Sequence, residues 1–146
     1  MVKPDVVGRK LTRATDWLDR AEEILARPSE EFLDDTNGRD LASFYLFLTI
    51  QECIDLAAHW VADARWGSPD EAGRTFELLA DRRAITRDLA EKLRSAVGLR
   101  NLIAHGYSLV DHKRIQTEYR EGVEALWQFL ALVADEAGLE IEHQSS

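Results

Sequence analysis

Residues 39–60 read RDLASFYLFLTIQECIDLAAHW, and this stretch decides the fold class. Its apolar side chains recur at spacings typical of one face of a helix, at Leu41, Phe44, Leu48, Cys53, Leu56 and Trp60. The apolar stripe widens between residues 45 and 50, which indicates that other helices pack on more than one side of it. We therefore expect a long helix over 39–66 within an all-α fold.

The rest of the chain repeats the same helical pattern. Pro28 forbids continuation of a first helix, Ser68 and Glu71 match a capping box, Asp111 can cap a last helix, and Gly138 can end it. These signals predict an antiparallel bundle of about five helices in a single domain, 1–146. The expected helices are 6–27, 39–66, 69–81, 86–104 and 112–137, with a loop over 29–38 and a frayed tail over 139–146.

Length and cysteine content place the chain among soluble intracellular domains. At 146 residues, one domain buries roughly 68–70% of its unfolded surface without disulfides. The single cysteine, Cys53, excludes an internal disulfide and suits a reducing compartment. The start MVKPDVVGRK lacks an apolar signal-peptide core, and the longest apolar run, 41–50, is about half of a membrane span. We expect a cytoplasmic protein with no membrane partner.

The charge distribution is uneven. A net charge of −9 argues against an indiscriminate nucleic-acid binder, because phosphate affinity comes mainly from Lys and Arg. Residues 82–120 nevertheless hold nine Lys/Arg against four Asp/Glu, which makes this segment basic while the remainder is strongly acidic. Such a segment is either a solvated helix surface or part of a binding site.

The basic segment contains LRNLIAHGYS at 99–108, where four polar side chains interrupt an apolar pattern. An ideal helix turns about 100° per residue, so Asn101 and His105 share a face, and Arg100 and Tyr107 nearly eclipse each other. Arg100 and His105 diverge by about 140° on the same helix. The two side chains converge on one ligand only if the helix loosens near Gly106 or a second subunit completes the site.

The string R-N-x-x-x-H-x-Y, formed by Arg100, Asn101, His105 and Tyr107, resembles the signature of HEPN-domain ribonucleases. The similarity is to the HepT-like toxins of HEPN/MNT toxin–antitoxin pairs. It extends from residue 39 to the helix that contains LWQFLALV and covers about two thirds of the chain.

The resemblance implies a HEPN-like homodimeric helical bundle that cleaves RNA without a metal or other cofactor, with both motifs facing a shared cleft. It also implies a small MNT-type nucleotidyltransferase antitoxin as partner, in a complex that extends beyond the dimer. In this family the antitoxin can add adenylate to the motif tyrosine, here Tyr107.

Metal-free RNA cleavage needs a base for the 2′-hydroxyl proton and a donor that stabilises the charged phosphorane. The imidazole of His105 is suited to proton transfer near neutral pH, and Arg100 offers a planar fork to phosphate. Asn101 is the third catalytic candidate, which would orient the imidazole or bind the backbone, and a structural hydrogen bond is its alternative. Tyr107 either binds a phosphate oxygen or a base of the RNA, or is a half-buried aromatic. His105 as a simple helix cap is the competing interpretation.

Further polar residues lie on the long helix. Glu52, Asp55 and His59 are three and four apart, but a carboxylate-bridged metal site needs a second Glu-x-x-His, so we expect no metal. Glu52 or Asp55 is instead expected to hold Arg100. His112 is expected to be solvated. The leading hypothesis is a metal-independent endoribonuclease toxin, and the alternative is a non-catalytic HEPN-like module that binds a nucleotide or a partner protein.

Overall fold

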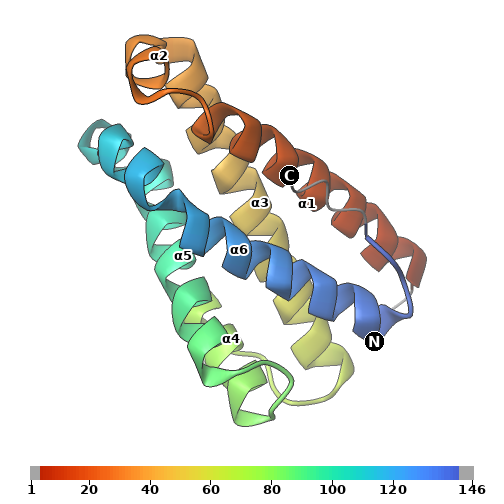
Figure 1. The fold of residues 1–146 in the computed structure, drawn as a ribbon. Helices are drawn as coiled ribbons and strands as arrows, with labels where there is room; N and C mark the ends of the chain where they lie inside the picture. Colours follow the sequence, from red (N-terminus) through yellow and green to blue (C-terminus); the bar gives the residue numbers. More distant parts are fainter. Residues whose placement is uncertain (1–3, 142–146) are drawn as a thin grey trace.

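The computed structural model describes residues 4–141, and within this range the chain forms six α-helices and one 3-10 helix (Figure 1). The four long helices alternate in direction, as Figure 1 shows, so the predicted all-α antiparallel bundle is confirmed. The elements in order are α1 (Pro4–Leu25), α2 (Ser29–Asp34), α3 (Thr36–Asp63), α4 (Ala72–Asp81), α5 (Arg87–His105), η1 (Tyr107–Leu109) and α6 (His112–Ala137).

Helix α3 occupies the middle of the bundle and contacts α1, α4, α5 and α6. This arrangement explains why its apolar residues spread around most of the helix. Cys53, Leu56 and Trp60 are buried as expected, and burial raises the pKa of the Cys53 thiol. Leu41 and Phe44 depart from the predicted stripe, because their side chains are exposed at the start of α3.

Length and composition alone would allow α3 to cross a membrane. Half of its most apolar window is buried inside the bundle.

Residues 29–34 form helix α2 rather than the predicted loop. Phe32 is the reason, because one helical turn directs its side chain into the core, where it is almost completely buried. Asp35 then caps α3 by accepting a hydrogen bond from the Gly38 amide at 3.0 Å. A Cβ atom at Gly38 would lie 2.6 Å from the Asp35 carboxylate, so a larger residue there would displace the capping side chain.

Helix α4 begins at Ala72, three residues after the predicted start at Pro69, and Ser68 does not cap it. The first side chains of α4 that are buried in the core are Thr75 and Phe76. Residues 69–71 therefore gain little burial from a helical conformation, and the local capping signal is overridden.

Helix α6 spans the predicted residues 112–137. Asp111 accepts a hydrogen bond from the Arg114 amide at 3.0 Å, and Gly138 ends the helix in the left-handed conformation. Beyond Gly138, Leu139 and Ile141 pack against the core. Residues 142–146 of the predicted frayed tail lie outside the described range.

Candidate active site

The motif lies where α5 ends and the chain turns into α6. Thr86 caps the start of α5, and the Gly106 amide closes its end with a hydrogen bond to the Leu102 carbonyl. Helix α5 stops at His105, so Tyr107 belongs to η1 and leaves the helical face that it was expected to share with Arg100. The chain leaves the helix at Gly106, after both Arg100 and His105, so this break does not bring the two side chains together.

Arg100 is half-buried, and two hydrogen bonds fix its guanidinium. Nη1 donates to Gln51 Oε1 of α3 at 2.6 Å, and Nε donates to Asn101 Oδ1 at 2.9 Å. Within residues 4–141, Nη2 has no hydrogen-bond or ion-pair partner. Two nitrogens of the guanidinium, Nε and Nη1, are therefore bound, and Nη2 is open to a ligand.

Glu52 and Asp55 do not serve as the expected supports of Arg100, because both pair with α1. Glu52 accepts hydrogen bonds from Lys10 Nζ at 2.9 Å and from Arg13 Nη2 at 3.4 Å. Asp55 lies 3.6 Å from the same lysine nitrogen. On an ideal helix Gln51 points about 100° away from Glu52, toward α5 instead of α1.

His105 is exposed in the last turn of α5, and no residue in the described range forms a hydrogen bond or ion pair with it. Asn101 is exposed as well, and its side-chain oxygen is bound to Arg100. In this chain Asn101 therefore orients the guanidinium, which favours a structural hydrogen bond over orientation of the imidazole.

Tyr107 docks onto the start of α3. Its hydroxyl donates a hydrogen bond to Asp40 Oδ1, and its ring lies edge-on to the ring of His112, with centroids 5.6 Å apart at 75°. Burial, followed by the hydrogen bond to Asp40, raises the pKa of Tyr107 above its ordinary value. His112 is half-buried under this ring instead of solvated, and burial lowers its pKa.

Two nitrogen atoms near Tyr107 are buried without a hydrogen-bond partner in residues 4–141, namely Arg39 Nε and His112 Nδ1. The other two nitrogens of the Arg39 guanidinium donate to the Leu33 carbonyl and to the Thr36 hydroxyl. Arg39 is therefore directed toward α2, and the Asp40 carboxylate is left to the tyrosine.

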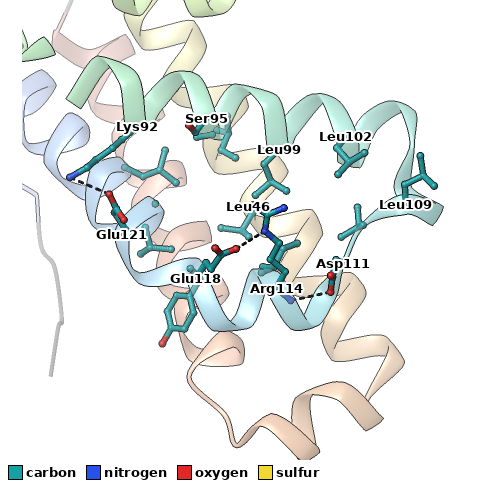
Figure 2. Close-up of a pocket in the computed structure, with 18 residues that line it drawn as sticks. Leu46, Lys92, Ser95, Leu99, Leu102, Leu109, Asp111, Arg114, Glu118 and Glu121 are labelled. Atoms are coloured by element: carbon teal, nitrogen blue, oxygen red, sulfur yellow. Dashed lines mark hydrogen bonds and ion pairs between the residues drawn. The ribbon is translucent and has the colours of Figure 1, made fainter. Parts of the chain in front are cut away.

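A groove of about 490 Å³ runs between α5 and α6 beside the motif (Figure 2). Leu99, Leu102 and Leu109 lie along one side of it, as Figure 2 shows. Arg114 and Glu118 form an ion pair at 2.7 Å on the α6 side. The groove thus combines an apolar wall with a charged rim.

Four of the nine Lys and Arg residues in the basic segment form ion pairs with carboxylates. Arg94 pairs with Glu77 at 2.6 Å, and Lys92 pairs with Asp88 at 3.1 Å. Arg87 and Arg114 also form ion pairs with carboxylates. Arg100 has neutral amides as its hydrogen-bond partners, so its positive charge is not balanced by a paired carboxylate.

Five large apolar side chains are exposed in the described part of the chain, and they come from the start of α3 and the end of α5 with η1. Leu109 is 76% exposed and Phe44 is 53% exposed. The others are Leu41, Leu102 and Tyr107. An apolar surface of this kind beside polar motif residues is typical of a protein interface.

The family model described as "Ribonuclease HepT-like" matches residues 15–133 of this chain. The chain belongs to the HepT-like ribonuclease family. The resemblance noted in the sequence is confirmed, and the matched range contains Arg100, Asn101, His105 and Tyr107.

Relatives of this HepT-like chain agree with the assignment. The mRNA nuclease HepT of Shewanella oneidensis is 26% identical over 132 residues, which cover 90% of this chain and 98% of the relative. A solved structure of the tri-AMPylated HEPN toxin of that organism, in complex with MNT antitoxin, has a TM-score of 0.78 at 24% identity and covers 88% of this chain and 96% of the toxin.

The cytosolic protein YutE of Bacillus subtilis, a protein of unknown function, shares the fold more distantly. Its TM-score is 0.68 at 15% identity, and the match covers 86% of this chain and 88% of YutE. The similarity to YutE and to the AMPylated toxin shows that the HepT-like chain shares their fold.

Sequence reasoning missed Gln51 and Asp40 at this HepT-like site. A neutral amide beside Glu52 carries no signal of its own, and Asp40 is 67 residues away from Tyr107 in the chain. Their roles depend on the rotation of α3 relative to α5. Three or more His, Cys, Asp or Glu side chains do not gather into a metal-binding group anywhere in residues 4–141.

Proposed function

We propose that this HepT-like chain is a metal-independent endoribonuclease toxin, with Arg100 and His105 as its catalytic residues. The observation that carries the proposal is the fixed Arg100 guanidinium, held by Gln51 and Asn101 on one edge and open on the other, near an exposed imidazole. The residues that match the family motif and the local geometry therefore support the same reaction.

In the proposed reaction His105 takes the proton from a ribose 2′-hydroxyl, and the 2′-oxygen attacks the adjacent phosphorus. The bond from phosphorus to the 5′-oxygen breaks, which leaves a 2′,3′-cyclic phosphate and a 5′-hydroxyl. Arg100 Nη2 donates to a phosphate oxygen as negative charge develops there. Proton transfer of this type contributes about 10²–10⁴-fold, and the two side chains supply base and cation without a metal ion.

A homodimer is the second part of the proposal. Arg100 points back to α3, whereas His105 is exposed one turn later, so one chain alone leaves the site open. The exposed Leu41, Phe44 and Leu109 border the motif and would be covered by a second copy. A two-fold axis through this surface brings the two motifs to a shared cleft.

The third part of the proposal is neutralisation by an MNT-type nucleotidyltransferase that adenylylates Tyr107. The Shewanella oneidensis relative is AMPylated and bound to MNT antitoxin, and Tyr107 is the motif tyrosine of this chain. Tyr107 is 37% exposed, while Tyr45 and Tyr119 are partly buried along helices that pack on the core. An adenylate would add a phosphodiester charge near Arg100 and fill space that RNA needs.

The proposal is tested by incubating the purified chain with total RNA in excess EDTA. Wild type should cleave, while Arg100→Ala and His105→Ala should each lose at least about 10²-fold with unchanged helical circular dichroism. Activity that EDTA abolishes and a divalent ion restores would refute metal independence. A folded wild type that never cleaves RNA would favour the non-catalytic module, and we expect the active toxin to act in the cytoplasm.

A further inference from the structure

We propose that Asp40 is the proton acceptor for nucleotidyl transfer to Tyr107, so that the toxin carries part of the catalytic machinery for its own inactivation. This inference rests on the proposed adenylylation of Tyr107. The carrying observation is the hydrogen bond from the Tyr107 hydroxyl to Asp40 Oδ1, which joins η1 to the start of α3 across 67 residues of sequence.

The contact holds the tyrosine in one orientation while leaving it accessible. The His112 ring supports the phenol ring from α6, and the Asp40 carboxylate fixes the hydroxyl oxygen. Tyr107 and Asp40 both remain exposed to solvent. A nucleoside triphosphate bound to a partner protein can therefore approach the hydroxyl from outside.

The chemistry requires a proton acceptor at this position. In the transfer, the Tyr107 oxygen attacks the α-phosphorus of ATP, the bond from that phosphorus to the bridging oxygen breaks, and pyrophosphate leaves with the electron pair. The phenolic proton passes to Asp40 Oδ1, which already accepts the hydrogen bond. Burial keeps the pKa of Tyr107 raised, so little phenolate is present at neutral pH and the acceptor is needed.

The charged groups around Asp40 leave its carboxylate available. Arg39 precedes it on α3 but directs two of its three guanidinium nitrogens to the Leu33 carbonyl and the Thr36 hydroxyl. His112 and Asp111, at the start of α6, are the other titratable groups of the cluster. The hydrogen bond of the Tyr107 hydroxyl is thus the one that engages Asp40 within residues 4–141.

Adenylylation also changes the interaction between Asp40 and the Tyr107 side chain from attraction to repulsion. Modified Tyr107 has no hydroxyl proton to donate, and its phosphodiester places a second negative charge beside the carboxylate. Two anions at hydrogen-bond separation repel each other. The adenylylated side chain therefore leaves α3, and the return of the unmodified orientation is blocked.

The test follows adenylylation by intact mass over time, with the MNT-type partner and ATP. Asp40→Asn should slow the rate by at least about 10²-fold, while Asp40→Glu should recover a large part of it. Asp34→Asn is the matched control, because it removes the same charge from an exposed residue of α2. Tyr107→Phe should show no mass shift.

A pH profile separates proton transfer from a purely structural role. The rate for Asp40→Asn should rise about tenfold per pH unit toward the pKa of the phenol, because hydroxide then replaces the lost acceptor. Equal rates and equal pH profiles for wild type and Asp40→Asn would overturn the role of Asp40 while leaving adenylylation intact. A wild type that gains no mass would refute adenylylation itself, and with it the role of Asp40.

A readout without the partner checks the contact directly. The ionisation of Tyr107 is isolated by subtracting the ultraviolet absorbance of a matching protein that carries Tyr107→Phe. The midpoint of this difference should lie at lower pH in Asp40→Asn than in wild type, because the hydrogen bond to Asp40 raises the pKa of Tyr107. An unchanged midpoint would show that Asp40 does not engage the hydroxyl in solution, which would also overturn the inference.

Discussion

Gln51→Ala should weaken RNA cleavage without unfolding the protein, because it removes the acceptor that fixes Arg100. The lost bond joins a charged nitrogen to the amide oxygen at 2.6 Å, and hydrogen bonds to charged groups contribute about 1.5–3 kcal/mol. Arg100 is only half-buried, so water replaces part of this energy. We expect a loss near the lower bound, which corresponds to about tenfold in kcat/KM.

The assay compares single-turnover cleavage of one RNA by wild type, Gln51→Ala and the matched control Gln128→Ala, which alters an exposed glutamine of α6. The control should retain wild-type activity, and all three should melt at similar temperatures. In an Arg100→Ala background, Gln51→Ala should cost nothing further, since its partner is gone. If Gln51→Ala lowers the cleavage rate by the same factor in the wild-type and Arg100→Ala backgrounds, the conclusion that Gln51 acts through Arg100 is refuted.

Further predictions concern stability, assembly and titration. Glu52→Ala should lower the free energy of unfolding by about 2–3 kcal/mol in urea titrations, because Lys10, whose side chain is only 17% exposed, loses its 2.9 Å partner. Asp16→Ala, at an exposed pair, should change it by less than about 1 kcal/mol. Phe44→Arg should convert the expected dimer to monomer in light scattering, because it places a charge on the apolar surface; an unchanged dimer would exclude this surface as the interface. Tyr107 should ionise above pH 10, because its pKa in the folded protein is raised. Its contribution to the free energy of unfolding should be present below pH 10 and should be lost as the pH rises through the native pKa. A Tyr107 midpoint at or below 10 would contradict its burial beside Asp40.

Features encoded by neighbouring residues were predictable from the sequence. Asp111 and Gly138 marked both ends of α6, because a capping carboxylate and a left-handed glycine act within one turn of the helix. The same local reasoning failed at Ser68 and Phe32, where burial in the core decides which residues become helical. Local signals therefore predict where helices lie. They predict where helices end only at positions where packing in the core favours the same boundary.

The candidate site was predictable in part. The spacing of the motif places Arg100 and His105 at the end of α5, yet it says nothing of the residues that α3 presents to them. Charge suggested Glu52, whereas the rotation of α3 presents Gln51 to Arg100 and directs Glu52 to Lys10. Asp40 likewise contacts Tyr107 because of the register between two helices, which a single sequence does not specify.

Two matched RNA oligonucleotides test the central claim most directly, one all-ribose and one with a 2′-deoxy sugar at the cleaved position, each incubated with the wild-type chain in excess EDTA. The account predicts cleavage of the all-ribose strand to a 2′,3′-cyclic phosphate, and no cleavage of the deoxy strand, because the 2′-oxygen is the nucleophile that His105 activates. Cleavage of the deoxy strand at the same position, or an intact all-ribose strand, would contradict the account.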